Sequence, residues 1–259
     1  PVDIPPEENT YAGSPAIRQA YGNASGTNRE CSGAAEEYAS MVDKLDRQVG
    51  AIVDQVRKLG LDKRTIIIFS SDNGHELYYR TDKGRGRGPD CHGGVLDGTG
   101  ELLDVFRGSR GHVGPNNAMA NLAGLKWTSH EGGIRVPLII SWPGTLPHGK
   151  VCHSLVANYD HMASFADLAG IRMPEGKDAV SYMDILSGNS ARQRDYVVVD
   201  HTVITGDGWK LTQKQNKPFL FHIGRDPEER NNLAGTRKDQ LEKLRAIYRK
   251  EVGSPRKDR

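Results

Sequence analysis

The sequence predicts an α/β fold that continues into a small antiparallel α+β subdomain at its C-terminal end. An amphipathic helical pattern runs from Glu36 to Leu59 and stops at Gly60, a residue type that commonly follows a helix. A short loop leads into the apolar run Thr65–Phe69, whose composition is typical of a strand buried on both faces of a parallel sheet. Helix, loop and strand together form half of a βαβ unit.

Turn and capping residues predict the next elements. Residues 1–35 are rich in Pro, Gly, Ser and Asn, which predicts a surface loop. Residues 75–125 are interrupted by glycines throughout, and a long irregular stretch of this kind indicates either a functional loop or a wrong interpretation of the pattern. A second buried strand, Leu138–Ser141, ends in a Pro-Gly turn, and Asp160 is positioned to cap a helix that reaches Leu168.

The chain changes character after about residue 190. Three short strands are predicted at Tyr196–Val199, Trp209–Thr212 and Phe219–Phe221, followed by a charged amphipathic helix over Lys238–Lys250. Closely spaced strands without helices between them indicate an antiparallel sheet. We therefore expect an α/β domain over residues 1–190 and a small subdomain over residues 191–259.

Composition excludes several classes of protein. The net charge of +2, with scattered basic residues, gives no basis for nucleic-acid binding. The mean hydropathy is −0.60 and no apolar run approaches the length of a membrane span. The three cysteines Cys31, Cys91 and Cys152 lack the spacing of a metal site.

Asp72 and Asn73 are the most informative polar residues, because they directly follow the apolar strand. Ligands of open α/β sheets collect at the carboxyl ends of the strands. A carboxylate beside a carboxamide suits a hard cation such as Ca²⁺ or Mg²⁺, which prefers oxygen ligands. The alternative is structural, since Asp-Asn-Gly is also a favourable turn after a strand.

Six motifs occur in an order that resembles the type I sulfatases, within the alkaline-phosphatase-like superfamily. The resemblance extends from about Tyr38 to Ala234. Its parts are Leu45–Gly50, Ser71–Gly74, Lys126 ahead of His130–Pro137, Trp142–Gly144, Asp160 ahead of Leu168–Gly170, and Phe221–Leu233. Each motif alone is weak, but their shared order favours the metal-site interpretation of Asp72 and Asn73.

The resemblance implies a hydrolase of sulfate esters, with a sulfated sugar as the expected substrate. In that family a cysteine or serine is converted to formylglycine by a formylglycine-generating enzyme, and a cation, usually Ca²⁺ with Mg²⁺ as the alternative, bridges nucleophile and sulfate. Asp72 and Asn73 match two metal ligands. Lys126 matches the lysine that reaches the sulfate or the leaving-group oxygen. The family also implies export to the periplasm, the lysosome or the exterior.

Other residues of the second motif have expected structural roles. Gly132 and Gly133 are expected to allow a tight backbone path, and Pro137 to fix the start of the next strand. Glu131 and Arg135 are expected to form a buried ion pair. Two histidines beside matched positions, His75 and His130, are candidates for a general acid or a substrate contact, with packed or surface histidines as the alternative.

Two departures from the family pattern limit the expectation. Neither the Cys/Ser-x-Pro/Ala-x-Arg nucleophile motif nor the first pair of metal-binding aspartates is present. We therefore expect this chain to be the C-terminal part of a longer sulfatase, inactive without its upstream half. The rival hypotheses are a phosphatase or phosphodiesterase of the same superfamily, and a non-catalytic binding module that retains the fold.

Overall fold

The computed structural model describes residues 10–15, 29–74, 122–123, 128–188, 194–214 and 217–253. It divides into two compact units, one made of residues 1–67 and 73–137 and the other of residues 68–72 and 138–259. Each unit is described by itself below. The predicted boundary between residues 190 and 191 stays a prediction.

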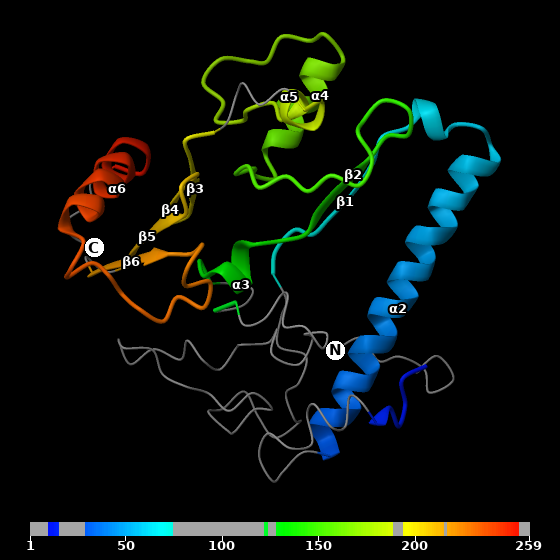
Figure 1. Cartoon of the computed structure of the whole chain (residues 1–259), viewed down its shortest axis with the longest axis horizontal. Coiled ribbons are helices and arrows are strands. Elements are labelled where there is room, and N and C mark those ends of the chain that lie inside the picture. Colours follow the sequence, from blue (N-terminus) through cyan, green and yellow to red (C-terminus); the bar gives the residue numbers. More distant parts are fainter. Residues whose placement is uncertain are drawn as a thin grey trace. The chain divides into compact units, whose positions relative to one another are not determined.

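The first unit contains one long helix, α2, which spans Arg29–Lys58 (Figure 1). It begins before the predicted start at Glu36, so the prediction of a loop over residues 1–35 is wrong from Arg29 onward. Good helix formers such as Glu30 and the Ala34–Ala35 pair support this extension. Gly60 ends the helical region with a φ of +66°, which favours glycine.

The segment at residues 10–13 is fastened to α2 by two hydrogen bonds. The backbone N–H of Tyr11 donates to the Ser40 hydroxyl over 3.2 Å. The N–H of Gly13 donates to a Glu36 carboxylate oxygen over 2.8 Å. Glu36 and Ser40 are both buried, so these contacts satisfy polar groups that water does not reach.

A 3₁₀ turn at Asp62–Arg64 connects α2 to strand β1, Ile67–Ser70, which pairs with β2, Leu138–Ser141. Both strands occur where the apolar runs predict them, but their predicted burial is wrong. Residues of β1 are only half-buried, and Ile139 in β2 is 62% exposed. The reason lies in packing, since the described residues form only a two-stranded sheet here and leave apolar faces uncovered.

Two short helices follow β2 in the second unit. Helix α4 spans Asp160–Leu168 and helix α5 spans Met183–Leu186, and the two are in contact. Gly170 follows α4 with a φ of +67°, a backbone conformation that L side chains rarely adopt. Helix α5 has no counterpart in the predictions, because one turn is too short to establish a helical period.

The C-terminal part of the second unit is an antiparallel sheet of four strands in the order β3-β4-β5-β6. Its strands are Tyr196–Val199, Thr202–Thr205, Trp209–Lys214 and Lys217–His222, and helix α6, Lys238–Glu251, packs on the sheet (Figure 1). The predicted subdomain architecture is confirmed. The predictions missed β4, because the turn before it, Asp200-His201, lacks glycine.

Apolar residues from the sheet and from α6 form the core of this part. The core consists of Val203, Leu211, Leu220, Leu241, Leu244 and Tyr248. Three of these residues lie on adjacent strands, and the other three repeat along one face of α6 at helical spacing. Burial of this face explains why a helix with many charged residues is stable here. Across the described residues, no helix is long and apolar enough to span a membrane.

Candidate functional site

The end of β1 carries the two predicted metal ligands. Asp72 is exposed and Asn73 is half-buried, directly after the strand and the connecting residue Ser71. The Ser71 hydroxyl donates a long hydrogen bond of 3.4 Å to Asp72 Oδ1. A carboxylate at the surface, adjacent to a carboxamide, is a chemically suitable pair of oxygen donors.

Gly74 is in close backbone contact with the turn at Gly132–Gly133. The N–H of Gly74 donates to the carbonyl oxygen of Gly133 over 2.8 Å. A Cβ at position 74 would lie 1.8 Å from the carbonyl oxygen of Gly132, far inside any contact distance. Only glycine fits at position 74, and the two motifs that sequence reasoning matched separately therefore meet at this point.

The turn that faces Gly74 is the single helical turn α3, Glu131–Ile134. His130, the residue before it, has an extended backbone conformation. Glu131, Gly132 and Gly133 are buried. The N–H of Gly132 donates to the carbonyl oxygen of Ala123 over 2.6 Å, and the N–H of Arg135 donates to that of Glu131 over 2.9 Å. These two backbone hydrogen bonds hold the buried turn in place.

The ion pair expected between Glu131 and Arg135 is looser than predicted. Arg135 Nη1 lies 3.8 Å from Glu131 Oε2, and the side chains are 59% and 4% exposed, respectively. The expectation of a buried pair is therefore wrong for Arg135, because the end of α3 directs this side chain to solvent. Pro137 is exposed and lies immediately before β2.

Two of the predicted catalytic residues, His75 and Lys126, lie outside the residues that the structure describes, and their roles stay predictions. His130 lies at the start of α3, and its Nδ1 atom is buried. The structure thus brings Gly74, the residue after Asn73, against the turn that His130 begins.

Asp72 and Asn73 fit a hard divalent cation in chemical kind but do not complete its shell. Ca²⁺ takes about six to eight oxygen ligands, of which these two side chains supply a minority. Within the described ranges, no group of three or more His, Cys, Asp or Glu residues is arranged to hold a metal ion. The remaining ligands have to come from elsewhere in the protein.

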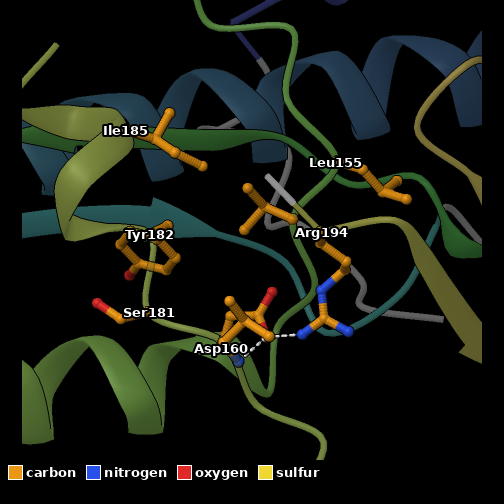
Figure 2. Close-up of a pocket in the computed structure, with 8 residues that line it drawn as sticks. Leu155, Asp160, Ser181, Tyr182, Ile185 and Arg194 are labelled. Atoms are coloured by element: carbon orange, nitrogen blue, oxygen red, sulfur yellow. Dashed lines mark hydrogen bonds and ion pairs between the residues drawn. The ribbon is translucent and has the colours of Figure 1, made fainter. Parts of the chain in front are cut away.

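A buried ion pair that sequence reasoning missed joins α4 to the start of the C-terminal sheet. Asp160 is 2% exposed and pairs with the guanidinium of Arg194, whose side chain is 9% exposed (Figure 2). Asp160 was expected to cap its own helix, but its carboxylate instead accepts hydrogen bonds from the N–H groups of Ala157 (2.8 Å) and Val180 (2.9 Å). No local pattern signals this pair, because its members are 34 positions apart.

The recess beside this pair is too small for a substrate. It is lined by apolar side chains together with Asp160, Tyr182 and Arg194 (Figure 2), and its cavity volume is about 10 Å³. A volume of this size holds about one water molecule. Burial raises the pKa of the Tyr182 phenol, and the pKa of the neighbouring Tyr159 is raised for the same reason although Arg194 opposes it. The recess is therefore a structural junction and no candidate for substrate binding.

The last matched motif forms a tightly bonded segment after β6. The carboxylate of Asp226 accepts the N–H groups of Arg230 (3.1 Å) and Asn231 (2.9 Å). Asn232 Oδ1 accepts the N–H of Leu220 over 3.0 Å, which fastens the segment to the edge strand β6. Backbone hydrogen bonds thus occupy the side-chain oxygens of Asp226 and Asn232.

Comparison with protein-family models finds two overlapping matches. The family described as Sulfatase matches residues 4–171. The family described as N-sulphoglucosamine sulphohydrolase, C-terminal, matches residues 126–257. Together the two matches include every motif described above.

Individual relatives are distant in sequence and considerably longer than this chain. The chain is 25% identical over 248 residues to an N-acetylgalactosamine-6-sulfatase of Sus scrofa, a match that covers 81% of the chain and 41% of the relative. It is 27% identical over 213 residues to an N-acetylgalactosamine-6-O-sulfatase of Bacteroides thetaiotaomicron, covering 74% and 37%. The chain therefore spans less than half of the length of these relatives.

Solved structures share the fold. The crystal structure of Ps i-CgsB in complex with k-i-k-neocarrahexaose superimposes with a TM-score of 0.63 at 23% identity, covering 96% of this chain and 47% of that one. A protein in complex with its substrate D-glucosamine-2-N,6-O-disulfate gives a TM-score of 0.56 at 20% identity, covering 86% and 42%. At these identities the likeness establishes the α/β fold with its C-terminal subdomain.

Proposed function

This chain belongs to the sulfatase family, and we propose that it forms part of an enzyme that hydrolyses a sulfate monoester carried by a sugar. The family match over residues 4–171 carries the proposal, because it includes both the Asp72–Gly74 segment and the turn at Gly132–Gly133. The close contact of Gly74 with Gly132 and Gly133 supports a common site for the two motifs.

The names of the relatives support a sulfated sugar as the substrate class. Two relatives are N-acetylgalactosamine-6-sulfatases, one mammalian and one bacterial. One structural neighbour was solved with the disulfated sugar D-glucosamine-2-N,6-O-disulfate as its substrate. We propose a sulfated hexosamine or a related sulfated carbohydrate for this protein.

The proposed chemistry assigns separate tasks to the side chains. Asp72 and Asn73 hold the cation, which we propose to be Ca²⁺, with Mg²⁺ as the alternative, and which supplies positive charge beside the sulfate oxygens when bound. The ammonium of Lys126 stabilises the negative charge that develops on the leaving oxygen as the S–O bond breaks. His130 is proposed as a substrate contact or general acid, as is His75.

The proposal includes partners outside this chain. The nucleophile and the remaining metal ligands come from an upstream part of the same enzyme, and a formylglycine-generating enzyme converts the nucleophile. Export to the periplasm, the lysosome or the exterior belongs to the same proposal and rests on the family resemblance alone.

The test uses the full-length protein, produced together with a formylglycine-generating enzyme. Sulfate release is measured from an aryl sulfate and from N-acetylhexosamine 6-sulfates, for the wild type and for Asp72→Ala and Lys126→Ala. Asp54→Ala, at an exposed position of α2, is the matched control. We expect hydrolysis by the wild type and the control, and a loss of about a hundredfold or more in both site variants, since electrostatic groups of this kind contribute at that scale.

Two outcomes contradict the proposal in different ways. Hydrolysis of phosphate esters without hydrolysis of sulfate esters indicates a phosphatase of the same superfamily. No hydrolysis of either ester, together with no Ca²⁺ binding, indicates a binding module that retains the fold without the chemistry.

A further inference from the structure

We propose that Asn158 is a positioning residue for Asp72, acting through the backbone carbonyl of Ser71. The inference rests on the proposed function, in which Asp72 is a cation ligand, and adds a residue of this chain that determines how that ligand is presented. It requires no contact between Asn158 and either the cation or the substrate.

The evidence begins with one hydrogen bond between segments far apart in the chain. Asn158 Nδ2 donates to the carbonyl oxygen of Ser71 over 3.2 Å, across 87 positions in sequence. The same oxygen accepts a weaker contact from the Ser70 hydroxyl at 3.5 Å. The amide of Asn158 is therefore the better placed of these two donors to the peptide that precedes Asp72.

Peptide geometry explains how this bond affects Asp72. The carbonyl of Ser71 and the N–H of Asp72 belong to one peptide unit, which resonance keeps planar. Holding the oxygen restrains the tilt of this plane, and Asp72 shares that restraint because its N–H lies in the same plane. Groups that hydrogen-bond metal ligands directly typically change metal affinity by about ten- to a hundredfold when they are replaced, and we expect the lower end of this range for a contact through the backbone.

Asn158 is itself held in place by the buried pair described above. The Asp160 carboxylate accepts the N–H of Ala157 over 2.8 Å, and the N–H of Asp160 donates to the carbonyl oxygen of Ala157 over 2.9 Å. The N–H of His161 donates to the carbonyl oxygen of Asn158 over 3.3 Å. Asp160 in turn forms a buried ion pair with Arg194 (Figure 2), so the backbone next to Asn158 is held by buried contacts.

The side chain of Asn158 is also suitable for a decisive test, because it is exposed. Exposed substitutions usually change stability little. If Asn158 is only a solvated surface residue, its replacement leaves Ca²⁺ affinity unchanged. If it positions Asp72, its replacement lowers Ca²⁺ affinity.

The experiment measures Ca²⁺ binding to the full-length protein by isothermal titration calorimetry, and sulfate release at saturating Ca²⁺. Asn158→Leu removes the amide at nearly constant size. Asn158→His restores an N–H donor at the same number of bonds from the backbone as Nδ2. Asn231→Leu is the matched control, an exposed asparagine whose described hydrogen bond is made by its backbone N–H.

We expect Asn158→Leu to weaken Ca²⁺ binding about tenfold with little change in melting temperature, in line with other groups that orient metal ligands. Asn158→His recovers part of that affinity, and Asn231→Leu binds as the wild type does. At saturating Ca²⁺ we expect the kcat of Asn158→Leu to approach the wild-type value. A variant that had simply unfolded would not regain activity when Ca²⁺ is added.

The outcomes separate this inference from the proposed function. If the wild type binds Ca²⁺ and hydrolyses sulfate esters while Asn158→Leu binds Ca²⁺ equally well, the positioning role is wrong and the proposed function stands. A lowered melting temperature with unchanged affinity also overturns it, since Asn158 would then be merely structural. If the wild type neither binds Ca²⁺ nor releases sulfate, the proposed function fails, and this inference fails with it.

Discussion

Lys210 Nζ lies 3.0 Å from Glu229 Oε1, and both side chains are completely buried, at 0% exposure. Lys210 belongs to β5, opposite Phe221 of β6, and Glu229 belongs to the segment that follows β6. Glu229 adopts a φ of +50°, an uncommon conformation for a residue with a side chain. The pair thus holds an otherwise unfavourable backbone turn against the sheet.

Removing one member of this pair is expected to destabilise the protein strongly. Glu229→Gln or Lys210→Met leaves a buried charge without the counter-charge at 3.0 Å, and such changes cost about 3–5 kcal/mol. The double variant Lys210→Met/Glu229→Leu recovers most of this loss, because no charge remains buried. Urea unfolding of the full-length protein measures the effect.

The control for this prediction is a surface pair of similar length. Arg47 Nη1 and Asp43 Oδ2 are 2.6 Å apart on α2, with side chains 57% and 32% exposed. Asp43→Asn is expected to cost about 0.3–0.5 kcal/mol, as exposed helical pairs do. Equal costs for the buried and the exposed pair would contradict the proposed importance of burial.

Gly74→Ala is expected to disrupt the candidate site. Its Cβ would lie 1.8 Å from the Gly132 carbonyl oxygen, and the three nearest atoms all belong to backbone, so no flexible side chain can move aside. We expect sulfate release to fall at least tenfold, because a misplacement of about 1 Å can cost a hundredfold in rate. Gly50→Ala is the control, since nothing lies within 4 Å of a Cβ there, and alanine within a helix stabilises by about 1 kcal/mol. An active Gly74→Ala variant would show that the turn at Gly132 is free to move.

Asp160→Asn is expected to loosen the junction between α4 and the C-terminal sheet. The substitution leaves the buried Arg194 without its carboxylate partner and weakens acceptance of the Ala157 and Val180 N–H groups. A loss of about 3–5 kcal/mol follows from breaking a buried pair. Asp167→Asn, at an exposed contact with the Ser181 hydroxyl, is the comparison and is expected to remain within about 0.5 kcal/mol of wild type. Thermal melting distinguishes the two variants.

The contact between α6 and β3 is expected to weaken in acid. Glu251 accepts hydrogen bonds from Lys250 (2.7 Å) and from the Tyr196 hydroxyl (2.5 Å), and these bonds, together with the charge of Lys250, lower the pKa of Glu251 below its ordinary value of 4.5. A lowered pKa means that the folded state favours the carboxylate. Its stabilising contribution is therefore complete above pH 4.5 and is lost as the pH falls through the lowered pKa.

Comparing Glu251→Gln with wild type tests this pH dependence. The difference in melting temperature is expected to be largest at neutral pH and to shrink toward zero in acid, where both side chains are uncharged. A difference that stays constant from neutral pH to pH 3 would show that the carboxylate charge contributes nothing. The raised pKa of Lys250 keeps the ammonium charged over this whole range.

The sequence by itself determined the elements whose signals are local. The end of helix α2 before Gly60, strands β1 and β2, and helix α6 lie where periodicity and turn residues predicted them. The α/β fold with its C-terminal subdomain is confirmed. These elements can be predicted from one sequence because helical and strand periods depend on residues that are close together in the chain. The order of the motifs also identified the family.

Only the tertiary structure decided which distant residues meet. Asn158 bonds to Ser71 across 87 positions, Asp160 pairs with Arg194 across 34, and Gly74 packs against Gly132. None of these contacts has a periodic signature, because each depends on how separate elements pack. The exposure of β2 and of Arg135 was mispredicted for the same reason: composition indicates what a strand or an ion pair prefers, whereas burial is set by the neighbours that the fold supplies.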